Sequence, residues 1–118
     1  MTVYVKEGAN TVLAGLTNMK AAMIEDYLGF MPPKDEVRKK MCEEYENNFT
    51  ITYGKKYIKI TEKGGGVKAF VVGVDNDKVF KKGDILKPAG YNAPARNAAR
   101  GNILEGNYAI NWTGPLYL

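Results

Sequence analysis

The spacing of apolar residues changes at Asn47-Asn48, and this change constrains the fold more than any other feature of the chain. Before it, apolar side chains recur at three- and four-residue steps, which is typical of amphipathic helices. After it, apolar and polar side chains alternate, which is typical of half-buried strands. We therefore predict an α+β fold in a single domain, residues 1–118. It is mostly helical over residues 1–48 and mostly antiparallel strands, with one short helix, over residues 49–118.

The first helix is predicted to follow a short strand over residues 2–6. Asn10 and Thr17 are both suitable N-caps, so the start of the helix remains open between them. Gly29 is predicted at the C′ position, because glycine readily adopts the left-handed backbone conformation common there. The apolar stripe of this helix consists of Leu16, Met19, Met23 and Tyr27, with Leu13, Ile24 and Leu28 beside it.

A second helix is predicted to begin near Pro33 or Lys34 and to end at about Glu46. Proline suits the first turn of a helix, and early acidic side chains suit its positive end. The two helices are expected to form an N-terminal helical hairpin packed on the sheet. The apolar stripe of the second helix consists of Val37, Met41 and Tyr45.

The second half of the chain is predicted to form a small antiparallel sheet. Short alternating segments separated by turn residues, such as Gly54-Lys55-Lys56, are typical of a meander. We expect about three to five strands, twisted or partly closed into a small barrel. The predicted strands cover residues 49–53, 57–61, 67–74, 78–80 and 85–87.

Two elements are predicted after these strands. Residues 94–100 are expected to form a short helix, opened by Pro94 and closed by Gly101. The apolar tail, residues 108–118, is expected to be buried, either as a last strand of the same sheet or against a partner subunit. The second alternative makes the protein a homo-oligomer.

The composition argues against several classes of function. The chain has no histidine and a single cysteine, Cys42, so it lacks the commonest general base and the usual zinc ligands. We therefore expect no metal site, no cofactor and no enzymatic activity. No secretory signal or membrane-spanning run is recognisable, so we expect a cytoplasmic protein that is neither secreted nor membrane-bound.

The positive charge is concentrated in the C-terminal half. Residues 1–50 carry six basic and eight acidic side chains, a net charge of −2, whereas residues 51–118 carry eleven basic and five acidic ones, a net charge of +6. Any anionic partner is therefore expected to meet residues 51–118.

Two groups of residues are candidates for binding anions. Arg96 and Arg100 lie four positions apart, on one face of the predicted short helix, and could hold a phosphate group. Alternatively, one of these arginines pairs with Asp84 or Glu105 inside the fold. The anion site is expected to be completed by Lys81, Lys82 or Lys87.

The second group interleaves basic and aromatic side chains around the first predicted hairpin. It consists of Lys55, Lys56, Tyr57 and Lys59, with Tyr53 and Tyr91. Proteins use such a mixture to bind single-stranded nucleic acid. Sheets also favour tyrosine, and exposed turns favour lysine, without any ligand. Both explanations stay open at this point.

Several motifs follow one another in residues 55–118: KYIKI, FVV, FKKGDILKPA, APARN, ARGNI and WTGPLYL. In this order they resemble small uncharacterised proteins of marine bacteriophage genomes and ocean metagenomes. The resemblance implies a viral setting, with the host cytoplasm as location and a host or viral protein as partner. It implies no activity and no site residues.

We predict from these observations a phage-like, non-catalytic binding or assembly module that associates with itself through its apolar tail. The alternative is a module that binds single-stranded nucleic acid, or another polyanion, through the basic C-terminal half.

Overall fold

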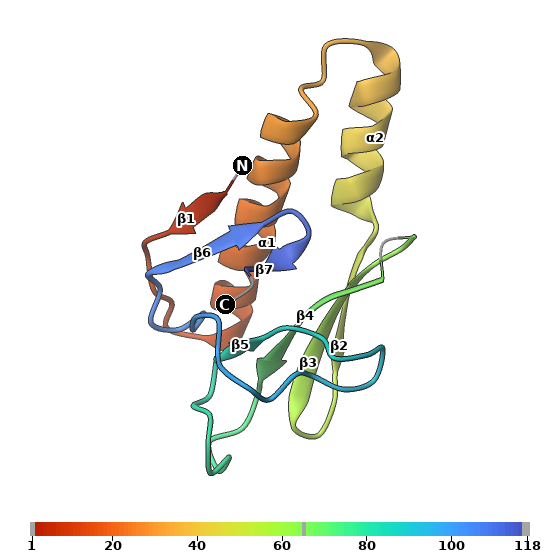
Figure 1. The fold of residues 1–118 in the computed structure, drawn as a ribbon. Helices are drawn as coiled ribbons and strands as arrows, with labels where there is room; N and C mark the ends of the chain where they lie inside the picture. The colour runs from red at the N-terminus through yellow and green to blue at the C-terminus, as the bar shows by residue number, and fades with distance from the viewer. Residues whose placement is uncertain (1, 65, 117–118) are drawn as a thin grey trace.

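The computed structural model describes residues 2–64 and 66–116, and in them the chain forms two helices and two antiparallel sheets (Figure 1). The predicted α+β class is therefore confirmed. In chain order the elements are β1 (Val3–Val5), α1 (Val12–Phe30), α2 (Glu36–Asn47), β2 (Phe49–Tyr53), β3 (Tyr57–Glu62), β4 (Gly66–Val72), β5 (Ile85–Leu86), β6 (Tyr108–Asn111) and β7 (Gly114–Pro115).

Helix α1 begins at neither of the two predicted N-caps. Thr11 caps it, and the hydroxyl oxygen of Thr11 accepts a hydrogen bond from the Ala14 N–H at 3.1 Å. Gly29 lies within the helix instead of ending it. The helix closes at Met31, whose N–H donates to the carbonyl of Tyr27 at 2.8 Å, so no left-handed glycine is required.

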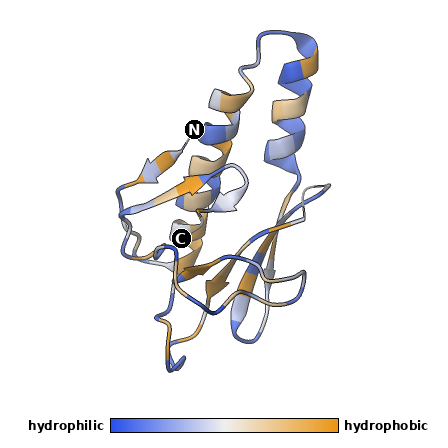
Figure 2. Ribbon diagram, viewed as in Figure 1, coloured by the Kyte–Doolittle hydropathy of each residue, from blue (hydrophilic) through white to orange (hydrophobic). Residues whose placement is uncertain are grey.

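The predicted stripe of α1 is its buried face. Leu16, Met19 and Met23 are at most 1% exposed, and they pack against strands of both sheets. The flanking Leu13 and Leu28 are 65% and 40% exposed, so the buried stripe is narrower than predicted. Figure 2 shows α1 as largely hydrophobic and α2 as mainly hydrophilic.

Helix α2 starts later than predicted and buries a different face. Asp35 is its N-cap and accepts a hydrogen bond from the Arg38 N–H at 2.8 Å. Of the predicted stripe only Tyr45 is buried, whereas Val37 is 70% exposed. Cys42 is the other buried residue of this helix. The hairpin of α1 and α2 exists, but its far end projects beyond both sheets, so nothing covers Val37 (Figure 1).

The larger sheet is the predicted meander, with strand order β2-β3-β4-β5 and antiparallel pairing throughout. It stays open, so of the two predicted alternatives, a twisted sheet or partial closure into a small barrel, the barrel is wrong. The predicted strand at residues 78–80 is also wrong. The Asp77 carboxylate accepts from the N–H groups of Val79 and Phe80, at 2.8 and 2.9 Å, and so occupies two amides that a strand would pair.

Residues 94–100 form no helix. The Ala95 N–H donates to the carbonyl of Lys87 and the Arg100 N–H to the carbonyl of Ile85, both at 2.7 Å. These amides thus bond to the segment around β5 instead of to carbonyls four residues earlier. Arg96 and Arg100 are consequently not neighbours on a helix face, which corrects the geometry predicted for the anion site.

The apolar tail forms a last strand, but in a second sheet. Strands β1, β6 and β7 pair in the order β1-β6-β7, with Val3 opposite Ile110 and Val5 opposite Tyr108. Tyr108 and Ile110 are 3% and 1% exposed and belong to the main core with α1. Residues 117–118 of the tail lie outside the described residues.

Candidate functional site: an aromatic pocket beside Trp112

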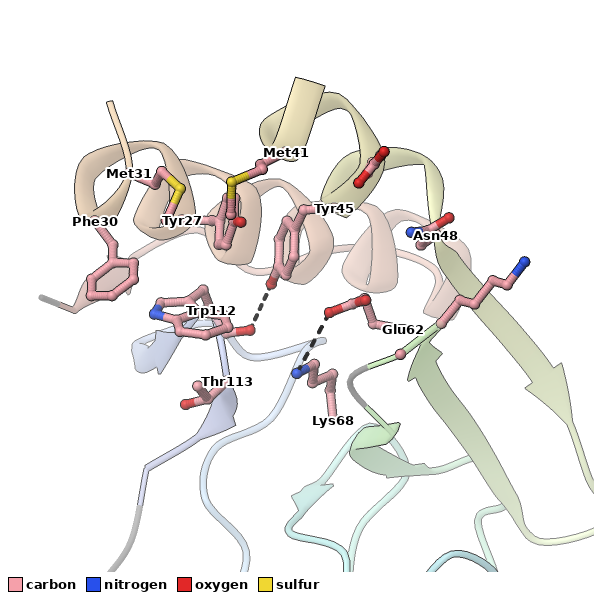
Figure 3. Close-up of a pocket in the computed structure, with 13 residues that line it drawn as sticks. Tyr27, Phe30, Met31, Met41, Tyr45, Asn48, Glu62, Lys68, Trp112 and Thr113 are labelled. Atoms are coloured by element: carbon pink, nitrogen blue, oxygen red, sulfur yellow. Dashed lines mark hydrogen bonds and ion pairs between the residues drawn. The ribbon is translucent and has the colours of Figure 1, made fainter. Parts of the chain in front are cut away.

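A pocket of about 580 Å³ lies where four elements meet: the C-terminal part of α1, helix α2, the β3–β4 hairpin and the turn between β6 and β7 (Figure 3). Ligand pockets in proteins commonly have volumes of about 300–1,000 Å³. The side chains that line this pocket include Tyr27, Phe30, Tyr45, Glu62, Lys68 and Trp112.

Four aromatic rings form one wall of the pocket. The rings of Tyr27 and Tyr45 are stacked, with centroids 4.2 Å apart and planes at 6°. Tyr27 meets Trp112 edge-on at 5.3 Å, and Phe30 stacks on Trp112 at 5.3 Å. Each such pair contributes about 0.5–1.5 kcal/mol beyond its buried area. The wall is therefore both apolar and rigid.

The backbone of Trp112 is held from two sides. Its N–H donates to the carboxylate of Asp26 on α1 at 2.8 Å, and its carbonyl accepts from the hydroxyl of Tyr45 on α2 at 2.6 Å. Burial, with smaller effects of Glu62 and Asp26, raises the pKa of Tyr45 above its usual 10. The Tyr45 hydroxyl therefore stays protonated and remains a donor at physiological pH.

The polar corner of the pocket consists of Lys68 and Glu62, which flank the turn of the β3–β4 hairpin. Their side chains are only 7% and 13% exposed, and Lys68 Nζ lies 3.8 Å from Glu62 Oε1. The ammonium also lies 5.5 Å from the ring centroid of Trp112. An N–H···O hydrogen bond normally spans about 2.7–3.2 Å, so the pair is an ion pair without a direct hydrogen bond.

The Lys68 ammonium makes no hydrogen bond to any of the described residues, although it carries three donors. Figure 3 shows it between Glu62 and Trp112 at the edge of the pocket. A buried cation without hydrogen bonds is costly, because burial removes its hydration shell. This corner therefore offers unused donors to a ligand. Among the residues that the structure covers, no three His, Cys, Asp or Glu side chains gather in a group that could hold a metal ion.

Comparison with protein families gives one match, which covers residues 4–118. The chain belongs to DUF7717, a family of unknown function. No curated protein and no solved structure is significantly similar to it. Within residues 2–64 and 66–116, no helix is long and apolar enough to cross a membrane. The DUF7717 match carries no statement about phage or marine origin, so that part of the resemblance stays a prediction.

Three of the predicted anion-binding residues of this DUF7717 chain meet in an internal network around Asp77. Arg96 contacts both carboxylate oxygens of Asp77, at 3.0 and 3.1 Å, and also donates to the hydroxyl of Tyr57. Lys56 Nζ lies 2.9 Å from Asp77. The partner of Arg96 is thus Asp77, neither Asp84 nor Glu105. These hydrogen bonds, that of Arg96 first, hold the pKa of the Asp77 carboxyl far below its usual range.

Arg100 and Lys87 meet at the C-terminal segment. Arg100 donates to the carbonyl of Leu116 at 2.8 Å and to the side chain of Asn97 at 3.1 Å. Lys87 donates to the carbonyl of Pro115 at 2.5 Å, and burial, together with the nearby Arg100, lowers the pKa of Lys87. Both cations therefore fasten the tail to the fold.

The remaining predicted cations are spread over the surface. Lys81 pairs with Glu105 at 2.6 Å, Lys82 lies 4.0 Å from Asp75, and Lys55 is exposed in the β2–β3 turn. The structure thus brings the predicted site residues together in two separate groups, around Asp77 and at the tail, and joins the others to neither.

The aromatic pocket itself was not predicted from the sequence. Glu62 and Lys68 flank one predicted hairpin, but nothing in the sequence indicates that Trp112, from a distant segment, meets them. The available signals were weak: Trp112 is the one tryptophan of the chain, and Lys68 is a charged residue in an otherwise apolar strand.

Proposed function

We propose that the protein is a non-catalytic binding module that takes a flat organic ligand into the aromatic pocket. The observation that carries this proposal is the buried Lys68 ammonium at the pocket edge, whose hydrogen-bonding capacity is unused among the described residues. A structural ion pair of this burial would ordinarily be hydrogen-bonded. A ligand acceptor group that meets Lys68 supplies the missing partner.

The walls support a flat and largely apolar ligand body. Trp112 and Phe30 offer ring faces, and Phe30 is 57% exposed, so a ligand can reach it from solvent. Met31 and Met41 border the same pocket, and methionine side chains adapt their shape to different partners. Stacking on such rings together with a charge-assisted hydrogen bond is a common way to hold a small polar aromatic molecule.

The test uses anilinonaphthalene sulfonate (ANS), which joins flat rings to an anionic acceptor group. Because Trp112 is the only tryptophan, energy transfer from it to ANS reports binding in this pocket. We expect saturable transfer with one site per chain. The double variant Glu62→Gln/Lys68→Met removes the pair without leaving a lone buried charge, and it should weaken binding at least about tenfold.

A matched control carries the same two substitutions at an exposed ion pair. Glu105→Gln/Lys81→Met changes the composition identically but lies outside the pocket. It should leave ANS binding unchanged. Absence of saturable energy transfer, or an equal loss in both double variants, would refute the proposal.

Two other predicted roles stay predictions. Assembly of a phage-like homo-oligomer through the tail is supported by its apolar character, but Tyr108 and Ile110 are already buried within the chain. Polyanion binding by the basic half is supported by its net charge of +6, but Arg96, Lys56 and Lys81 are engaged in internal ion pairs. We therefore rank both roles below ligand binding in the pocket.

A further inference from the structure

Strand β2 forms one edge of the larger sheet, and its backbone is paired only on the side of β3. The Gly54 N–H donates to the carbonyl of Tyr57 at 2.9 Å, so these two positions are a bonded pair of the ladder. Because bonded and non-bonded pairs alternate in an antiparallel ladder, the even-numbered residues of β2 bond to β3 and the odd-numbered ones face outward. The backbones of Ile51 and Tyr53 have no hydrogen-bond partner among the described residues.

The opposite edge of this sheet, at β5, is covered within the chain. The Ile85 N–H donates to the carbonyl of Gly101 at 2.8 Å, and the carbonyl of Ile85 accepts from the Arg100 N–H at 2.7 Å. No described residue covers β2 in this way. The strand also lacks the usual protection of an edge, because Phe49–Tyr53 contains no lysine or proline and its register with β3 has no bulge. The edge of β2 is therefore open to another strand.

A second copy of β2 is a well-matched partner for this edge. Antiparallel pairing centred on Ile51 bonds the outward N–H and C=O groups of this residue to those of Ile51 in the second copy. It sets Thr50 opposite Thr52, and Phe49 opposite Tyr53. Cross-strand pairs of two threonines or of two aromatic residues stabilise a sheet. The contact is the same from both sides, so it closes after two chains.

The charges at the two ends of β2 match the same arrangement. The last turns of α2 lead into β2 and carry Glu43, Glu44 and Glu46, which are exposed and form no ion pair with any described residue. A helix C-terminus favours cations, and the last turn of α2 has none. Lys55, in the turn at the other end of β2, is also exposed and without an ion pair among the described residues. Antiparallel pairing brings the Lys55 turn of each copy beside the α2 end of the other.

We propose that two copies of the chain join through β2, so that their four-stranded sheets become one continuous sheet. The second copy covers Tyr53, which is 61% exposed in the single chain. Each Lys55 supplies the cation that the acidic end of α2 lacks. This proposal is independent of ligand binding, because Phe49–Tyr53 does not line the aromatic pocket. It also differs from assembly through the apolar tail, which uses another sheet.

Sedimentation velocity and amide hydrogen exchange test the pairing. The mass should rise from 13.1 kDa to twice this value as the concentration increases to about 0.5 mM, since a strand-edge contact is a small interface. The amides of Ile51 and Tyr53 should become protected over the same range. The amide of Thr52, which already bonds to β3, is the internal reference and should not change. A mass that stays at 13.1 kDa, or exchange at Ile51 that is independent of concentration, overturns the proposal.

Charge reversal tests which ends meet. Lys55→Glu and Glu46→Lys each bring like charges together, and each should weaken dimerisation at least about tenfold. An equimolar mixture of the two variants should restore the wild-type affinity, because both contacts of the mixed dimer then join opposite charges. Lys78→Glu is the matched control, since Lys78 is exposed, lies outside β2 and its turn, and has no ion pair among the described residues.

The control variant Lys78→Glu should leave the affinity unchanged. If the mixture of Lys55→Glu and Glu46→Lys forms no more dimer than either variant alone, the proposed pairing is overturned. An equal loss in Lys78→Glu also overturns it, because the net charge of the chain would then explain the effect.

Discussion

The hydroxyl of Tyr45 donates to the backbone carbonyl of Trp112 across 67 positions of the chain, at 2.6 Å. Through this bond and the stacked Tyr27 ring, α2 is attached to the rest of the fold. Near its other end α2 is much less buried, since Val37 is 70% exposed. The wall of the pocket is therefore also the main attachment of the second helix.

Removal of the Tyr45 hydroxyl should destabilise the protein. In Tyr45→Phe the carbonyl of Trp112 loses its donor in a partly buried place, and we expect a loss of about 1–2 kcal/mol in the free energy of unfolding. Urea denaturation measures it. Tyr53→Phe is the control, because Tyr53 is 61% exposed. A loss in Tyr45→Phe no larger than in this control would contradict the prediction.

Replacement of Asp26 by alanine should lower the free energy of unfolding more than replacement by asparagine. Asp26 is 1% exposed, Oδ2 accepts from the Trp112 N–H, and Oδ1 has no hydrogen-bond partner among the residues that the structure describes. Asp26→Ala leaves that N–H unpaired and should cost about 1.5–3 kcal/mol. Asp26→Asn keeps an acceptor and removes a buried charge, so its free energy of unfolding should lie closer to the wild-type value. Equal losses in both variants would show that the carboxylate charge itself is needed.

The network around Asp77 should make the free energy of unfolding depend on pH. The folded state lowers the pKa of Asp77. The stabilisation that the Asp77 carboxylate gives to the folded state is therefore complete well above the unfolded pKa of about 4, and it declines as the pH falls below that value. Asp77→Asn removes the charge at every pH. The difference in unfolding free energy between wild type and Asp77→Asn should therefore be largest near pH 7 and shrink progressively from pH 4 to pH 2. Chemical denaturation along a pH series measures this difference, and a gap that is constant with pH would count against the network.

Gly114 should tolerate no side chain. Its φ of +119° is rare for residues with a Cβ, and a Cβ at this position would collide with the backbone carbonyl of Lys68. Since both groups belong to the backbone, neither can rotate away, and we expect Gly114→Ala to cost about 2 kcal/mol or more. Gly90→Ala is the control, because a Cβ there has no atom within 4 Å and the φ of Gly90 is not positive. Thermal unfolding of the two variants compares them directly.

The parts of the fold that depend on local spacing could be predicted from the sequence. The stripe of Leu16, Met19 and Met23 identified the buried face of α1, because burial repeats with the helical period. The hairpin of β2 and β3 followed from alternation on both sides of the turn at residues 54–56. The N-cap of α1 was misplaced, since Asn10, Thr11 and Thr17 all have suitable side chains.

The parts that depend on distant contacts could not be predicted. Pro94 and Gly101 are ordinary helix boundaries, yet Ala95 and Arg100 bond to carbonyls near β5 and the segment stays extended. Nothing in the sequence indicated which of several acidic residues pairs with Arg96, and in the structure this residue is Asp77. The candidate site could not be predicted for the same reason, because residues such as Glu62 and Trp112 become neighbours only through tertiary packing. Composition placed a positive charge in the second half, but it could not show which cations are already paired.

The pairing of β1 with β6 has a consequence for the order in which the chain can fold. Val3 leaves the ribosome long before its partner Ile110, because most of this domain lies between them in the chain. Until then β6 cannot cover α1, and the part of the apolar face of α1 that packs on Tyr108 and Ile110 lacks its partner. Contacts between such distant positions also form slowly, because closure of a long loop precedes them. The smaller sheet can therefore be completed only after every strand of the larger sheet has been synthesised.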